Sequence, residues 1–374
     1  MNTKISKIFF ILVLTILMPG CWDYTDIEEL SFPDIVAYDT YHMGRDKNVE
    51  GARLTVTMLF PEQTISGSGV YLNRTAGSTI GEIRNKRSFS SSKKTTFREA
   101  KVTLIGEQLA RREMNMDILL RQTAAKKSML IAVVKGRGDD LLDKGIEKDK
   151  KLANTIVDLL RVTPKEAFIV NATLNDFAII PFTPGKNMVA PLIELNENKE
   201  VRIAGTAIFK KTRMIDTIDQ DETRALVLLS GIKGKAYIDF AMYEKGKLID
   251  RGTVYMSNKR EVKVYKKDDK YHFDITIILN GDLIEHFNIK NFDEMLPYNK
   301  KIEKAVEERI KKECEDFIVQ MQEEFKVDCI DISKFALAKW RSQLEKEIDN
   351  EDFITNAVIN VKVKAKLDDI GERT

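Results

Sequence analysis

The feature that most restricts the fold of this chain is a long apolar stripe close to its C-terminus. Between Asn299 and Phe325, apolar side chains recur at steps of three or four residues, which is the period of one face of an α-helix. They are Ile302, Val306, Ile310, Cys314, Phe317, Met321 and Phe325, and Lys and Glu fill the opposite face. A helix this long must cover its apolar face. We expect it to pack across a sheet of the same chain rather than against a partner helix.

The segments around this helix alternate between apolar and polar residues at the strand period. Residues 237–240, 252–256, 260–265 and 271–279 predict a half-buried antiparallel sheet. The last of these places Phe273, Ile275, Ile277 and Leu279 on one face and His272, Asp274 and Thr276 on the other. Residues 357–367 predict a further strand whose lysines, Lys362, Lys364 and Lys366, keep one face wet and protect a sheet edge. A shorter helix should bury Trp340 with Phe335, Leu344 and Ile348.

The first half of the chain mixes shorter strands and helices. We expect strands at 53–60, closed by Pro61, and at 100–105, 128–135 and 201–210. We expect loops at 63–79 and 89–96, and helices from Ser78 or Thr79 and at 107–122, 149–161, 165–172 and 219–229, the last capped by Asp219. The fold class is therefore α+β and multidomain, with mixed or antiparallel sheets, packed helices and one long helix near the C-terminus.

Polar turn residues at 196–199 suggest a domain boundary. We expect a signal peptide at 1–20, an N-terminal α+β domain at 21–198 and a middle α+β domain at 199–258. The C-terminal domain, 259–374, then holds antiparallel sheet and the long helix.

The N-terminus has the form of a signal peptide. Lys4 and Lys7 precede an apolar run from Ile8 to Met18, which is interrupted only by Thr15 and is too short to span a bilayer. The run ends at Pro19-Gly20-Cys21, which is similar to a bacterial lipobox, where a small residue precedes the lipid-modified cysteine. The alternative is a core cysteine after a short buried helix. We expect cleavage before Cys21 and lipid on its thiol, and two or more acyl chains hold a protein stably on a membrane.

Charge argues against nucleic acid as a partner. After removal of residues 1–20, the chain carries 58 basic and 58 acidic residues, so its formal net charge is zero. Nucleic-acid binding draws on a surplus of Lys and Arg.

The sequence offers no assembled catalytic, cofactor or metal site. His42, His272 and His286 lack metal-ligand spacing. The segment 231–235 is shorter than a phosphate-binding loop, and the acidic pairs at 139–140 and 368–369 are typical of solvated loops. Cys314 and Cys329 could pair, although Cys314 lies on the apolar helix face and fits a core position. We expect no enzyme activity.

An ordered series of short motifs resembles one family. Cys21-Trp22-Asp23 followed by 27–30 (IEEL) resembles the mature start of the Ger(x)C lipoproteins, the C subunits of spore germinant receptors. Further similar segments follow in order: 77–80, 102–110, 119–121, 132–136, 205–211, 222–224, 326–328 and Trp340. Residues 31–35 and Cys329 depart from the family pattern.

This resemblance implies a function that the residues alone do not give. It implies three α+β domains and a non-enzymatic lipoprotein, anchored through Cys21 on the outer face of the spore inner membrane. Its partners there would be the membrane A and B subunits of the receptor, with which it supports nutrient-triggered germination. The alternative from the residues is a lipid-anchored solute-binding protein, which would usually show two similar α/β lobes joined by a hinge.

Overall fold

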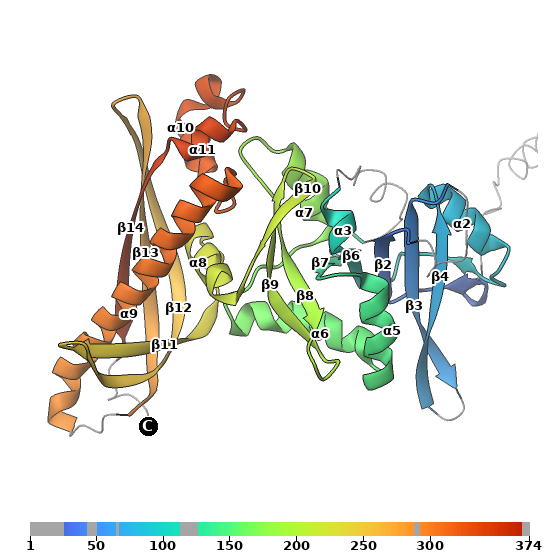
Figure 1. Cartoon of the computed structure of the whole chain (residues 1–374), viewed down its shortest axis with the longest axis horizontal. Helices are drawn as coiled ribbons and strands as arrows, with labels where there is room; N and C mark the ends of the chain where they lie inside the picture. The colour runs from blue at the N-terminus through green and yellow to red at the C-terminus, as the bar shows by residue number, and fades with distance from the viewer. Residues whose placement is uncertain (1–25, 43–50, 65–66, 113–125, 288–291, 369–374) are drawn as a thin grey trace, which may run out of the picture.

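The protein is elongated, with a sheet at each end of its long axis (Figure 1). The computed structural model describes residues 26–42, 51–64, 67–112, 126–287 and 292–368. Among them, no helix is long and apolar enough to cross a membrane.

An eight-stranded sheet forms the N-terminal half, in the order β10-β9-β8-β7-β6-β2-β3-β4. The four central strands, β2, β6, β7 and β8, are parallel to their neighbours in that group, and the outer strands are antiparallel. The bounds are β2 Ile35–Thr40, β3 Leu54–Thr64, β4 Gly67–Gly77, β6 Val102–Gly106, β7 Leu130–Val134, β8 Val189–Leu195, β9 Val201–Lys210 and β10 Arg213–Ile218. A separate two-stranded sheet joins β1 Leu30–Ser31 to β5 Lys94–Thr95.

Helices cover both faces of the eight-stranded sheet. α5 Gly138–Lys148 and α6 Leu152–Glu166 pack with Ile35, Leu104 and Ala132 on one face. On the other face, residues of α2 Ile80–Ser88, α3 Glu107–Ala110 and α7 Leu174–Ile179 join the core around Tyr38 and Ile131. The strands β2, β6 and β7 are therefore buried along their whole length, which explains why most of their residues are apolar.

The C-terminal half is a four-stranded sheet in the order β11-β12-β13-β14. The bounds are β11 Lys235–Glu244, β12 Lys247–Lys267, β13 Lys270–His286 and β14 Val358–Leu367, with α8 Gln220–Ser230 before it. The long helix α9 Phe292–Gln320 crosses the sheet diagonally and continues into a π-turn, η3 Met321–Phe325 (Figure 1). Then follow α10 Ser333–Leu344 and α11 Glu351–Thr355.

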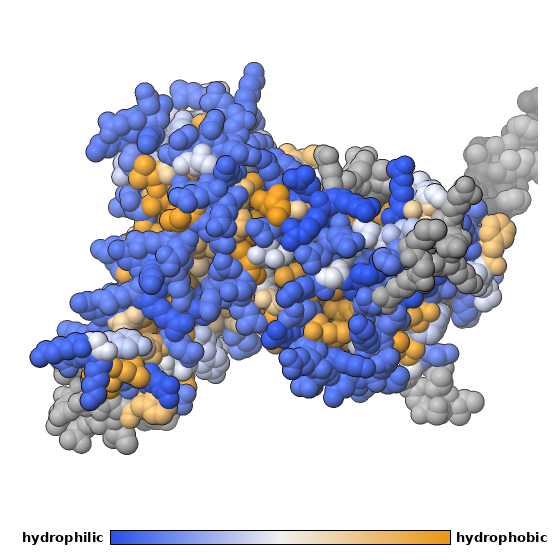
Figure 2. Space-filling model, viewed as in Figure 1, coloured by the Kyte–Doolittle hydropathy of each residue, from blue (hydrophilic) through white to orange (hydrophobic). Residues whose placement is uncertain are grey.

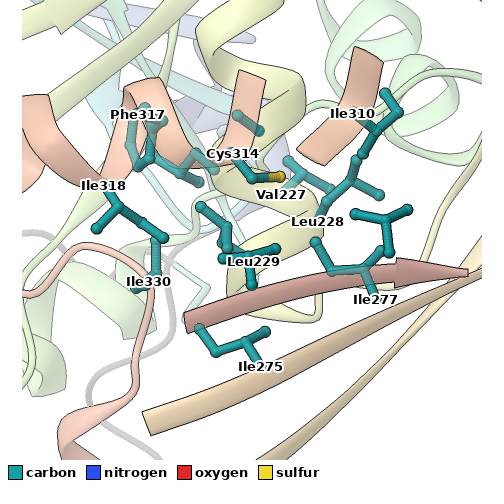
Figure 3. Close-up of a cluster of buried hydrophobic side chains, with 14 of the residues drawn as sticks. Val227, Leu228, Leu229, Ile275, Ile277, Ile310, Cys314, Phe317, Ile318 and Ile330 are labelled. Atoms are coloured by element: carbon teal, nitrogen blue, oxygen red, sulfur yellow. The ribbon is translucent and has the colours of Figure 1, made fainter. Parts of the chain in front are cut away.

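The core of this half confirms the predicted long helix and its packing. Cys314 and Phe317 of α9 face Leu229 of α8 and Ile275 of β13 across the interior (Figure 3). All seven side chains of the predicted stripe are buried, and five of them have no exposed surface. The cluster also takes in Ile208 of β9, so the two halves share apolar contacts.

Local features confirm several sequence signals. Thr79 caps α2 by accepting from the backbone N–H of Glu82. Asp219 caps α8 in a reciprocal capping box with Glu222. β14 lies at the sheet edge and leaves Lys362, Lys364 and Lys366 exposed, as expected.

Two predictions around Pro61 are wrong. Pro61 does not close β3, which continues to Thr64, and residues 67–77 form strand β4 instead of a loop. The carbonyl of Leu59 accepts from the N–H of Asp34, so the backbone of Leu59 faces the β2 side of β3. Backbone groups two residues further along a strand face the same side, so the nitrogen of Pro61 also faces this side. It lies beyond the paired part of β2, whose last pair in this direction is Ile35 with Leu59. The missing donor of Pro61 therefore costs no ladder bond, and β3 supplies the pairing that the glycine-containing β4 needs.

Helix limits also differ from the prediction. Residues 152–166 form one helix, α6, with Pro164 in its last turn, and 165–172 is not a second helix. Helix α5 was not predicted, and the predicted helix pair at 107–122 is described only as far as the short α3. Trp340 is half-buried at a kink in α10 instead of fully buried, with its ring 5.4 Å from that of Tyr271.

The predicted domain limits at 198 and 258 stay a prediction. The turn at 196–199 joins β8 to β9 inside the eight-stranded sheet, and β12 runs continuously through residue 258.

Candidate functional site

The described ranges contain no group of three or more His, Cys, Asp or Glu residues that could hold a metal ion. Cys314 and Cys329 are both free and buried, and burial raises the pKa of both thiols. Neither cysteine is therefore an activated nucleophile.

One buried polar cluster lies where α/β proteins usually bind ligands, at the carboxyl ends of parallel strands. Asp39 of β2 is 1% exposed, and its carboxylate accepts from the backbone N–H groups of Gly138 and Asp139 at 2.8 and 2.9 Å. These groups begin α5, so Asp39 caps that helix from 99 residues away in sequence. Gly106, on the neighbouring strand β6, leaves room for this, because a Cβ there would lie 2.0 Å from the Asp39 Oδ1.

Two arginines complete this cluster. Arg137 donates from Nε and a terminal nitrogen to both carboxylate oxygens of Asp139, each at 2.8 Å, and to the carbonyl of Thr40 at 2.9 Å. Arg74 of β4 lies 3.6 Å from Asp139 and also contacts Asp143 of α5. Asp139 is fully buried, so the prediction that the pair at 139–140 belongs to a solvated loop was wrong. The buried charge is tolerated because Arg137 pairs with it in bidentate geometry.

The ionisation of Asp39 is disfavoured in this setting. Burial and, second to it, the charge of Asp139 raise its pKa from 3.8 to about 6, and the two backbone N–H groups and Arg137 oppose the shift. The N-terminus of α5 is thus occupied by a carboxylate of the chain itself. The cluster fixes β2 to α5, and its helix terminus offers no room for a bound anion.

A second buried cluster lies at one end of the C-terminal sheet. Asp250 of β12 is 3% exposed and accepts from the backbone N–H of Phe287 at 3.1 Å and from the Tyr298 hydroxyl. The Nδ1 of His286 lies 3.1 Å from the Asp250 carboxylate. These contacts join β12, β13 and the start of α9, and they use Asp250 as a structural acceptor.

A cleft of about 440 Å³ lies between the two halves. The end of α6, the start of β9, the start of α8 and the start of β11 line it. Its charged groups are already engaged, because Arg224 pairs with Glu313 of α9 at 2.9 Å and with Asp221 at 2.7 Å. The Gln220 amide donates to the carbonyl of Ile203 at 2.7 Å.

The structure describes only some of the residues that the sequence singled out as candidate sites. Cys21 lies outside the described residues, so its lipidation stays a prediction. Gly231 is the left-handed C-cap of α8, and the Gly234 N–H donates to Asn258, so 231–235 is a structural turn between α8 and β11. Sequence reasoning missed Asp39 and Asp250. The signal available for Asp39 was one acidic residue at the end of an apolar run, whereas Asp250 lies in a mixed polar segment that gives no such signal.

Two family descriptions match consecutive parts of the chain. Residues 23–195 match "Spore germination protein N-terminal domain", and residues 204–371 match "Spore germination B3/GerAC like, C-terminal". Together the two matches cover nearly the whole chain, with the N-terminal description before the C-terminal one. The chain belongs to the Ger(x)C family of spore germination proteins.

Relatives and a solved structure agree with this Ger(x)C membership. The chain is 28% identical to YfkR of Bacillus subtilis (strain 168) over 64% of each protein, so this match spans a little under two thirds of YfkR. Spore germination protein B3 of the same organism is 25% identical over 88% of this chain and 87% of its own. The crystal structure of the GerBC protein matches with a TM-score of 0.58 at 16% identity, over 92% of this chain and all of that one. It supports the α+β fold with a long C-terminal helix.

Proposed function

We propose that this Ger(x)C protein is the lipid-anchored C subunit of a spore germinant receptor. In this proposal, Cys21 carries the lipid and holds the folded body on the outer face of the spore inner membrane, next to the A and B subunits. The observation that carries the proposal is the pair of family matches, which runs through 23–195 and 204–371 without rearrangement.

The protein is proposed to act through contacts rather than through catalysis. Both buried polar clusters use their carboxylates to hold secondary structure together, and the thiols are buried. A subunit anchored beside its partners gains effective concentration, so that individually weak contacts suffice for assembly.

Replacement of the anchor residue tests this proposal. The Cys21→Ala variant should leave the body folded and move it from the membrane fraction to the soluble fraction of spores. The strain should then lose its response to one class of nutrient, as a full deletion should, while spores stay viable by other germination routes. A strain with Trp22→Phe is a suitable control, because it alters the same segment and keeps the cysteine. Retention of the Cys21→Ala protein in membranes that lack the other subunits would refute the lipid anchor.

A solute-binding function is the second candidate, and the cleft between the two halves is the observation that favours it. Its volume of about 440 Å³ lies within the range of small-molecule sites. Calorimetry of the soluble body with amino acids and sugars separates the candidates. We expect weak or no binding, and micromolar binding of a nutrient would make the protein a sensor itself.

A further inference from the structure

Two exposed apolar side chains lie near the N-terminal end of the described chain. Phe89 follows the last turn of α2 and is 85% exposed, the highest value for a large apolar side chain in the described ranges. Figure 2 shows the hydropathy of one face of the molecule. Ile27, in the short 3₁₀ turn Ile27–Glu29, is 67% exposed. A phenylalanine that a folded domain leaves in water is a candidate for contact with another apolar phase.

The pairing of β1 with β5 brings these side chains to the same end of the molecule. The two strands are parallel, with Leu30 opposite Lys94 and Ser31 opposite Thr95. Because the strands run in the same direction, the segments that precede them lie at the same end. The turn that holds Ile27 and the loop 89–93 therefore both enter this strand pair from the same end.

Chain length places this end close to the proposed lipid. Five peptide links join Cys21 to Asp26, and an extended chain spans at most about 3.6 Å for each residue. The Cα of Asp26 thus lies within about 18 Å of the anchored cysteine, whatever the path between them. This step depends on the lipid anchor of the proposed function.

The loop that carries Phe89 is held in place from beneath. Arg87, the last but one residue of α2, is 5% exposed, stacks over the ring of Phe60 at 4.6 Å and donates from Nε to Thr95 at 2.6 Å. The Ser90 hydroxyl donates to the carbonyl of Arg87 at 3.2 Å. A loop fixed in this way presents Phe89 without a further ordering cost.

The charges at this end are of both signs. Lys93 and Lys94 are exposed on the loop, and Asp26, Glu28 and Glu29 are exposed on the neighbouring turn. Attraction to anionic lipid is therefore largely cancelled. Apolar insertion is the remaining source of binding, and it needs no particular headgroup.

We propose that Phe89 and Ile27 form a second membrane contact, which inserts into the bilayer interface beside the lipid of Cys21. The lipid supplies the affinity and the apolar contact supplies the orientation. The end with α2 then faces the bilayer, and the four-stranded C-terminal sheet lies at the opposite end of the long axis (Figure 1). This sheet is thereby held away from the membrane surface.

A fluorescent reporter in the loop tests the contact. Ser92→Cys, exposed and three residues from Phe89, is labelled in the lipidated full-length chain with an environment-sensitive dye. Cys314 and Cys329 are buried and therefore shielded from the reagent. The protein is bound to phosphatidylcholine vesicles that contain a spin-labelled quencher lipid. A second reporter, Tyr243→Cys, lies on β11 in the C-terminal sheet and is the control, since Tyr243 is 66% exposed.

Quenching should be strong at position 92 and weak at position 243. Adding Phe89→Ser should lower the inserted fraction of the loop about tenfold, while vesicle flotation stays unchanged because the lipid remains. Circular dichroism checks that this variant is folded, which is expected because Phe89 lies outside the core.

Three outcomes would overturn the inference. Chains that float with the vesicles but show equal quenching at both positions would exclude the contact while leaving the anchor intact. Protection of position 92 that arises only when the A and B subunits are added would assign the loop to a protein partner. Failure to float at all would refute the lipid anchor of the proposed function, and with it the premise of this contact.

Discussion

Replacing Asp39 by asparagine should change how the stability of the N-terminal half depends on pH. Burial raises the pKa of Asp39 from 3.8 to about 6 in the folded protein. A folded-state pKa above the unfolded value means that the folded state binds the proton more tightly. The protonated carboxyl therefore stabilises the fold below about pH 4, and this stabilisation is lost as the pH rises through 6. A shift of about two units corresponds to roughly 3 kcal/mol.

The assay is equilibrium unfolding in urea, followed by circular dichroism at pH 4, 5, 6 and 7. The side chain introduced by Asp39→Asn cannot ionise, so the stability of this variant relative to the native chain should improve by about 2–3 kcal/mol between pH 4 and pH 7. Leu142→Ala, a fully buried neutral change on α5, is the control, and its effect should not depend on pH. A difference between Asp39→Asn and the native chain that stays constant over this range would refute the account of Asp39.

Two further predictions concern packing, and unfolding curves at pH 7 check both. Gly205→Ala should lower the free energy of unfolding by about 1–3 kcal/mol, because the new Cβ would lie 1.9 Å from the Ile218 carbonyl oxygen. The control Gly81→Ala should stabilise α2 slightly, because the nearest atom to its new Cβ lies 3.9 Å away. Equal effects of the two would contradict this. Phe273→Ala should cost about 3–5 kcal/mol, because Phe273 is fully buried, and Trp340→Ala only about 1–2 kcal/mol, because Trp340 is half-buried. A larger loss at Trp340 than at Phe273 would show that the kink in α10 matters more than burial.

Periodic segments were predictable because their own side chains specify the buried face. The stripe from Ile302 to Phe325 and the alternation in β13 each describe one face without reference to the rest of the chain. The cap of α8 was equally local, since Asp219 and Glu222 satisfy each other within one turn.

Features that depend on distant partners could not be predicted in this way. β4 contains three glycines among its eleven residues and is a strand because β3 pairs with it along its whole length. The burial of Asp139 depends on Arg74 and on the position of Asp39, 100 residues earlier. Nothing in the local Gly-Asp-Asp sequence distinguishes this helix start from an exposed turn.

The position of β14 has a consequence for how the chain reaches its native state. β14 pairs in parallel with β13, and Asn360 donates to Asp274 across 86 residues of intervening chain. Such distant pairing is slow to form. Until the ten residues of β14 emerge from the ribosome, β13 has a free edge that can associate with other chains. We therefore expect nascent chains that stop before Val358 to depend on chaperones and to be degraded early, although they contain almost every other element of the fold.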